Sequence, residues 1–244
     1  MTTIAFLGVD HYCIPLPVML SDSTHGDIAE FELVTARLRD TAGAEGLGYT
    51  YTVGKGGAAI AALIERDLRP LLIGAEADRI EALWQRMWWA LHFGGRGGYA
   101  SLAISAVDIA LWDLKARRFG TPLWRLLGGH DPRVPAYAGG IDLDFPLDRL
   151  LRQTDDNLKK GFRAIKMKVG RERLSEDLER VKAMREHLGV DFPLMVTPIC
   201  GGASTRRCAR PERCRRTPFI GSRNRRSPTM WKATGGSCAM AACR

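Results

Sequence analysis

A change of composition near residue 197 divides the chain into two stretches that cannot fold in the same way. Residues 197–244 carry eleven Arg and Lys side chains against a single acid, Glu212, which gives them a net charge of about +10. The preceding 196 residues hold 25 basic and 26 acidic side chains, so the net charge of +9 comes from the tail. Because the tail also has no apolar period of a helix or strand, we expect it to be disordered.

The residues before 197 have the composition of a near-neutral globular protein. They contain no run near the ~20 apolar residues that a membrane helix needs, and residues 1–20 lack the features of a secretory signal. Cys13 is the only cysteine of this stretch, so no disulfide framework is expected there. The tail has five cysteines but no CxxC pair, which is weak evidence for zinc. We therefore expect a cytoplasmic protein that has no membrane partner.

Residues 1–130 predict strands first and helices afterwards, the order of a small α+β domain. Alternating apolar and polar residues over 29–52, interrupted by the turn sequence Asp40–Gly43, indicate a β-hairpin. Apolar residues at helical spacing then predict helices at 58–66, 77–92 and 100–118. Pro70 is expected to end the first of these helices.

Residues 131–196 follow a different pattern, in which short strands alternate with helices. Strands are expected at 134–139, 164–169 and 192–196, and helices at 146–160 and 175–188. Helices of this length between short strands are typical of a parallel sheet built from βα units. The pattern covers about two and a half units and stops where the composition changes.

Two lysines on the middle strand of this pattern are the strongest candidates for chemistry. In the run Ile165–Gly170, Lys166 and Lys168 lie on one face of the strand, and the apolar residues between and beside them lie on the other. They stand at the carboxyl end of the strand, the end that carries the active site in βα-barrels. Neighbouring like charges can make a lysine a usable base near neutral pH. The alternative is that both lysines simply reach solvent.

Other polar features before residue 197 are weaker. His25 lies in the polar loop Ser21–Gly26 and could contact a ligand, although a lone loop histidine is usually only solvated. The glycine-rich run Gly94–Gly98 follows a helix and has no P-loop lysine, so a flexible connection is favoured over a phosphate site. Trp84, Trp88 and Trp89 are expected in the core or in a subunit interface.

Several motifs, in the same order along residues 30–196, resemble the enolase superfamily in its mandelate racemase and muconate-lactonizing branch. They are Ser105–Lys115, Pro122–Leu123, Leu126–Gly129, the K-x-K strand at Ala164–Gly170, and Phe192–Val196. The resemblance implies an α+β capping domain followed by the start of a (β/α)₈ TIM barrel. Members of this family associate through the capping domain, so it also implies that the intact parent is a homo-oligomer.

The resemblance also implies a reaction and a set of residues that perform it. Lys168 would remove the proton alpha to the carboxylate of a small molecule, with Lys166 supporting it, and Mg²⁺ held by carboxylates at the ends of later strands would stabilise the product. A lid containing His25 and Tyr51 would select the substrate. The region around Tyr51 resembles sugar-acid dehydratases most, and a racemase or cycloisomerase is the alternative.

The family pattern breaks at Thr197, where the resemblance calls for the sequence D-A-N and its metal-binding aspartate. Adding one base before the Thr197 codon permits a reading that begins D-A-N and later contains E-E-P, with an amphipathic helix between them. We therefore expect a one-base frame slip, and a chain that is truncated, lacks the Mg²⁺ ligands and is inactive as written. In a different class, the Arg-rich tail could bind RNA, although nucleic acid is the less favoured partner.

Overall fold

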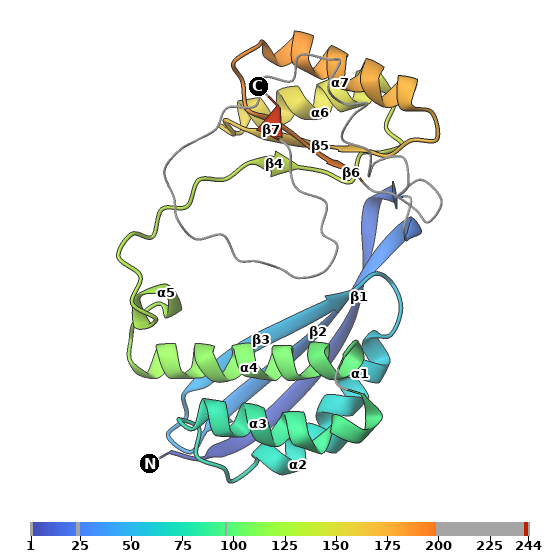
Figure 1. Ribbon diagram of the computed structural model, residues 1–244. Coiled ribbons are helices and arrows are strands. Elements are labelled where there is room, and N and C mark those ends of the chain that lie inside the picture. Colours follow the sequence, from blue (N-terminus) through green and yellow to red (C-terminus); the bar gives the residue numbers. More distant parts are fainter. Residues whose placement is uncertain (1, 23–24, 96, 199–241, 244) are drawn as a thin grey trace. The chain divides into compact units, whose positions relative to one another are not determined.

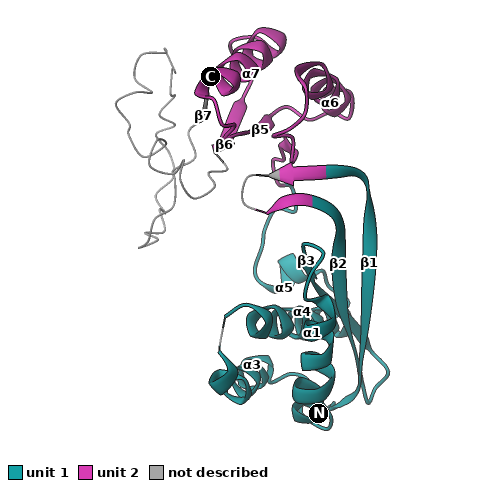
Figure 2. Ribbon diagram, turned by 90° about the vertical axis from the view of Figure 1, so that its right-hand side faces the viewer, with its two compact units in different colours: residues 1–19, 28–133 teal, residues 20–27, 134–244 magenta. Residues whose placement is uncertain are grey.

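The computed structural model describes residues 2–22, 25–95, 97–198 and 242–243, which form two compact units (Figures 1 and 2). The first unit comprises residues 1–19 and 28–133, and the second comprises 20–27 and 134–244. The expectation of a disordered tail falls almost wholly outside the described residues. An α+β arrangement followed by parallel β/α units is confirmed.

The first unit contains a three-stranded sheet in the order β1 (Ile4–Asp22), β2 (Gly26–Asp40) and β3 (Glu45–Thr52). Strands β2 and β3 pair antiparallel from Arg39 with Glu45 to Glu32 with Thr52, which confirms the hairpin. Strand β1 was not identified from the sequence, and it contains Pro15 and Pro17. It lies at the edge of the sheet, where a proline lacking its N–H need not break the ladder.

Helices cover one face of this sheet (Figure 1). The helical segments of this unit are α1 (Gly57–Leu63), the π-helical turn η1 (Ile64–Leu68), α2 (Arg69–Leu72), α3 (Ile80–Ala90), the 3₁₀ turn η2 (His92–Gly94), α4 (Tyr99–Arg118) and α5 (Leu123–Leu126), of which α5 follows α4 and lies apart from the sheet. The expectation that Pro70 ends the first helix was wrong. The helical backbone continues through the π-helical turn into α2, and Pro70 lies at the beginning of α2.

Helix α4 lies directly on strand β3, and two glycines make this close approach possible. A Cβ atom at Gly48 would collide with the carbonyl oxygen of Ala106, and one at Gly46 with that of Ala110. On the neighbouring strand, the alternating apolar side chains of Val34 and its partners on the same face are fully buried in the core. The tight helix–sheet packing therefore depends on residues that have no side chain.

The second unit contains a parallel sheet of β4 (Ala138–Gly139), β5 (Ile165–Val169) and β6 (Leu194–Pro198). Helices α6 (Leu147–Lys159) and α7 (Leu174–Leu188) connect the strands and cover one face of the sheet (Figure 1). Strand β4 is shorter than the expected strand at 134–139. A two-residue strand from the tail, β7 (Ala242–Cys243), pairs antiparallel with β6, although no strand was expected in the tail. Among the described residues, no helix combines the length and the apolar character needed to cross a membrane.

Candidate functional site

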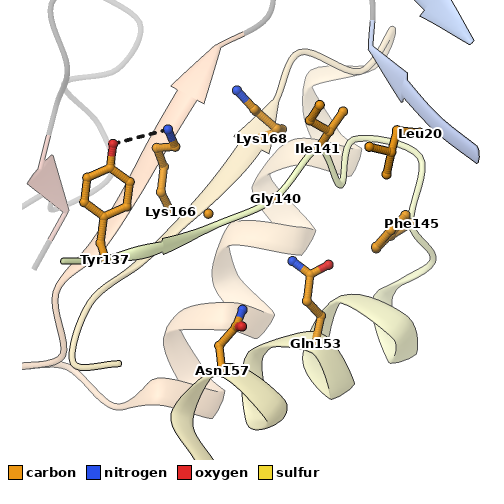
Figure 3. A pocket seen from close by; sticks show the side chains of 10 residues that line it. Leu20, Tyr137, Gly140, Ile141, Phe145, Gln153, Asn157, Lys166 and Lys168 are labelled. Atoms are coloured by element: carbon orange, nitrogen blue, oxygen red, sulfur yellow. Dashed lines mark hydrogen bonds between the residues drawn. The ribbon is translucent and has the colours of Figure 1, made fainter. Parts of the chain in front are cut away.

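Strand β5 presents its two lysines on one face and its apolar residues on the other, as the alternation predicts. Ile165 and Met167 are buried in the core formed with α6 and α7, whereas Lys166 and Lys168 are half-buried. The lysines line an open hollow of about 660 Å³, together with residues of β4, of the segment that follows it and of α6 (Figure 3). The two lysine side chains are therefore accessible to a small molecule from this hollow.

Lys166 has an aromatic neighbour that the sequence analysis did not identify. Its Nζ lies 3.4 Å from the hydroxyl oxygen of Tyr137 and 5.0 Å from the centre of the ring (Figure 3). Gly139, the partner of Lys166 in the β4–β5 register, leaves room for the lysine stem, because a Cβ there would stand 3.1 Å from the lysine Cε. No signal in the sequence indicated this contact, because Tyr137 fell inside the strand expected at 134–139 and the observed strand β4 begins one residue later.

The backbone of Lys168 is held from both sides by buried charged residues. Its N–H donates to Oδ1 of Asp142 at 2.8 Å, and its carbonyl oxygen accepts from Nη1 of Arg180 at 3.0 Å. Nη2 of the same guanidinium donates to the backbone carbonyl of Asp142 at 2.6 Å. Asp142 is 1% exposed and Arg180 is 3% exposed. These bonds join the end of β5 to the segment after β4 and fix where Lys168 stands.

Burial sets the protonation properties of this network. Removal from water raises the pKa of Asp142, and this effect exceeds the opposing effects of the Lys168 N–H and the charge of Arg180. Burial likewise lowers the pKa of Arg180. On the same helix, Asp177 accepts hydrogen bonds from the N–H groups of Gly170 and Arg171, at 2.8 and 3.1 Å. The loop after β5 is therefore held by a carboxylate whose pKa is also raised by burial.

Sequence reasoning missed Asp142, Asp177 and Arg180. A signal was present for the last two, because Asp177, Arg180 and Met184 recur at helical spacing on the buried side of α7. A charged residue on the apolar stripe of a helix normally has a specific buried partner. Asp142 follows the end of a strand, but nothing local distinguishes it from the nearby Asp144.

The two expected lid residues belong to different units. His25 lies in the turn between β1 and β2 and is grouped with the second unit. Tyr51 lies on β3 in the first unit, is 58% exposed, and contacts Phe31 edge-on with the ring centres 5.9 Å apart. Their role in substrate selection stays a prediction.

The residues described in the second unit do not fit a magnesium site of the implied kind. Thr197 on β6 pairs with Lys168 on β5, at the place where the resemblance expects an aspartate. A neutral hydroxyl is a poor substitute for a carboxylate ligand of Mg²⁺. In the part of the chain that the structure describes, one group of three His, Cys, Asp or Glu side chains is close enough to share a cation, and it lies on β1 and β2.

Two domain models match the chain in sequence. Residues 9–128 match the N-terminal domain of mandelate racemase and muconate lactonizing enzyme, and residues 149–210 match the enolase C-terminal domain-like family. The chain is 63% identical over 187 residues to the 3,6-anhydro-alpha-L-galactonate cycloisomerase of Streptomyces coelicolor, a match that covers 77% of this chain and 52% of that protein. It is 38% identical over 190 residues to the L-talarate/galactarate dehydratase of Salmonella typhimurium, covering 75% and 47%.

Solved structures agree with these matches. A racemase from Streptomyces coelicolor with bound magnesium superposes with a TM-score of 0.78 at 62% identity, covering 79% of this chain and 54% of that one. The Salmonella dehydratase with Mg and L-lyxarohydroxamate gives a TM-score of 0.75 at 35% identity, covering 80% and 51%. The chain therefore spans about half the length of the relatives it matches.

Both matched domains occur in one chain, and the relatives are sugar-acid dehydratases and cycloisomerases. The chain belongs to the enolase superfamily, in its mandelate racemase and muconate lactonizing enzyme branch.

Proposed function

We propose that the complete protein removes the proton alpha to the carboxylate of a sugar acid, with Lys168 as the base and Lys166 beside it. The observation that carries this proposal is the pair of half-buried lysines on one face of β5, at the hollow. A base must hold its nitrogen at a defined place relative to the substrate. The hydrogen bonds of Asp142 and Arg180 to the Lys168 backbone would supply that constraint.

The reaction that follows proton removal is a cycloisomerisation in this proposal, on a substrate of the 3,6-anhydrogalactonate type. The 63% identity to the Streptomyces coelicolor cycloisomerase supports it, because the identity to the L-talarate/galactarate and arabinonate dehydratases is only 36–38%. Dehydration of a sugar acid, which the sequence analysis favoured, is the second candidate. It is supported by the Salmonella and Saccharolobus relatives, which are dehydratases of L-talarate/galactarate and arabinonate.

We further propose that a one-base slip precedes the Thr197 codon and makes the chain inactive as written. The support is positional, because Thr197 stands level with Lys168 on the neighbouring strand. Restoring the other frame replaces this threonine with an aspartate. The metal-binding carboxylate would then stand beside the proposed base, at the position where Thr197 now offers only a hydroxyl, a poor ligand for Mg²⁺.

The test compares the gene as it stands with a gene that carries one added base after the Val196 codon and is read to its end. Each purified protein is mixed with Mg²⁺ and a sugar acid in D₂O, and exchange of the α-proton is followed by NMR. We expect exchange only from the restored protein. Lys168→Ala should lower its rate by about 10²–10⁴-fold, the usual contribution of a general base.

The matched control is Lys182→Ala, because Lys182 is an exposed lysine on α7 whose ion pair with Glu186 spans 3.8 Å. It should leave the exchange rate unchanged. Exchange catalysed by the unaltered chain would refute the proposed inactivity, and full exchange by the Lys168→Ala protein would refute the assignment of the base. Comparing anhydrogalactonate with galactarate as substrates separates the two candidate reactions.

A further inference from the structure

Three potential metal ligands meet on the sheet of the first unit, outside the proposed active site. His11 and Cys13 are two residues apart on β1, so their side chains share one face of the strand. Glu32 stands on the neighbouring strand β2. One ligand atom from each of the three side chains lies within 4.8 Å of the other two.

The spacing of the nitrogen and oxygen atoms suits a shared ion. Nε2 of His11 lies 3.0 Å from Oε1 of Glu32. Zinc bonds to nitrogen and oxygen at about 2.0–2.2 Å in a tetrahedral site, which separates two such ligands by roughly 3.3 Å. A small outward movement of either side chain would therefore replace their hydrogen bond with two metal bonds.

The second oxygen of Glu32 is already held by neighbouring groups. Oε2 accepts a hydrogen bond of 2.6 Å from the hydroxyl of Thr52 and one of 2.9 Å from the N–H of Gly57. These bonds orient the carboxylate and leave Oε1 directed toward His11, as outer-shell hydrogen bonds orient metal ligands in proteins. They also lower the pKa of Glu32, with the Thr52 bond as the largest cause, so the carboxylate is ionised at neutral pH.

The surroundings restrict the imidazole and leave access to the thiol. A Cβ atom at Gly57 would lie 2.5 Å from Nε2 of His11, so the close contact between the start of α1 and the ring requires a glycine. The side chain of His11 is 25% exposed, and Cys13 is an exposed free cysteine. An ion can therefore reach the three ligands from solvent.

We propose that His11, Cys13 and Glu32 bind a zinc ion in the first unit. A thiolate, an imidazole and a carboxylate form a donor set that favours Zn²⁺ over Mg²⁺, and three protein ligands leave a fourth position for water. The ion links β1 to β2 beside the start of α1. This site is independent of the proposed reaction.

The test uses the full chain with Cys200, Cys208, Cys214, Cys238 and Cys243 replaced by serine, so that Cys13 is the only thiol. Cobalt is added as a spectroscopic substitute for zinc. We expect the near-ultraviolet absorption of a thiolate–Co²⁺ bond at one equivalent, and its loss when zinc is added. Cys13→Ser should abolish the absorption without disturbing the core, because this side chain is exposed.

Two further variants test the geometry. Thr52→Val removes the donor to Oε2 of Glu32 and should weaken zinc affinity by about 10–100-fold, the usual effect of losing an outer-shell partner. His130→Gln changes an exposed histidine outside the group and should leave the affinity unchanged. Circular dichroism confirms that each variant is folded. An absorption that survives in the Cys13→Ser protein, or the absence of stoichiometric cobalt binding by the folded chain, overturns the proposal.

Discussion

The interiors of the two units differ in the kinds of interaction that stabilise them. The buried cluster of the first unit joins the sheet to α1–α4 and consists of apolar side chains, many of which have no exposed surface. The first unit also buries two carboxylates, those of Glu32 and Asp40. The apolar cluster of the second unit is smaller, and three charged side chains, Asp142, Asp177 and Arg180, are buried beside it. Apolar packing therefore contributes more to the core of the first unit, whereas polar bonds position the functional strand of the second.

This difference follows from the kind of contact that each unit requires. The glycines of β3 allow α4 to approach closely, and the apolar contacts that result have no directional requirement. The carboxyl end of β5 instead has to hold one backbone segment at a defined place. Buried charges are a poor source of stability, because desolvation offsets their attraction. Their hydrogen bonds to the Lys168 backbone are directional, which apolar contacts are not.

The largest effect that would test this comparison is expected from Arg180→Ala. It leaves the carboxylate of Asp142 buried without its cationic neighbour and the carbonyl of Lys168 without a donor. The second unit should lose about 3–5 kcal/mol of stability, as when one member of a buried ion pair is removed. Hydrogen exchange of the β5 amides measures the loss. The control Lys182→Ala breaks an exposed pair and should cost under about 0.5 kcal/mol.

The Arg180→Ala protein also tests whether the polar network affects the stability of the first unit. Exchange in the α4 and β3 amides of the first unit should be unchanged if the polar network acts only on the second. Equal acceleration in both units would contradict the separation of the two kinds of stabilisation.

An intermediate effect is expected from Gly48→Ala in the first unit. The added methyl group would overlap the backbone of α4 at Ala106 and Ala110, and overpacking of this kind costs about 1–3 kcal/mol. The five tryptophans before residue 197 all lie in the first unit, so fluorescence during urea unfolding reports on it once Trp231 is replaced by Phe. Gly94→Ala, a site with no atom within 4 Å of the new methyl group, is the control. An unchanged urea midpoint for Gly48→Ala would show that the helix can move away.

The smallest predicted effect is that acidification changes the stability of the two units in opposite directions. The pKa of Glu32 in the first unit is lowered, chiefly by the Thr52 hydrogen bond, so its stabilising contribution is complete above the ordinary value of 4.5 and is lost as the pH falls below it. The pKa values of Asp142 and Asp177 are raised by burial, so the cost of keeping them ionised is relieved as the pH falls through those values toward 3.8.

Hydrogen exchange at a series of pH values, corrected for the intrinsic rate, measures this difference. Protection in β2 and β3 should fall as the pH drops below 4.5, while protection in β5 should rise or hold at and above 3.8. Parallel losses in the two units would contradict the assigned directions. Glu32→Gln should remove the acid sensitivity of β2 that depends on this carboxylate.

Much of the fold could be predicted from residue spacing, because the strong periods are local. The hairpin at β2 and β3 and the helices α4, α6 and α7 agree with the expected ranges within a few residues. The failures occurred where the tertiary context decides. Strand β1 contains prolines that are tolerated because it lies at the edge of its sheet, and Pro70 continues a helix because a π-helical turn precedes it.

In the candidate site, too, local spacing predicted some features and could not predict others. The alternation along β5 was sufficient to place Lys166 and Lys168 on one face of the strand, with Lys168 next to its last residue. It could not identify Tyr137, Asp142 or Arg180 as their partners, since these residues are 12 to 29 positions away from the lysines they contact. The proposed zinc ligands show the same limit, because Glu32 meets His11 only through the pairing of β1 with β2.

The sequence by itself determined the change of composition near residue 197, the family of the chain, and the face of β5 on which the two lysines stand. Tertiary structure alone decided which charged groups hold the Lys168 backbone, which glycines α4 requires, and which three ligands meet on the first sheet. The physical reason is that the period of a helix or strand reports the direction of a side chain relative to its own backbone. The identity of its partner depends on which distant segment the folded chain brings into contact.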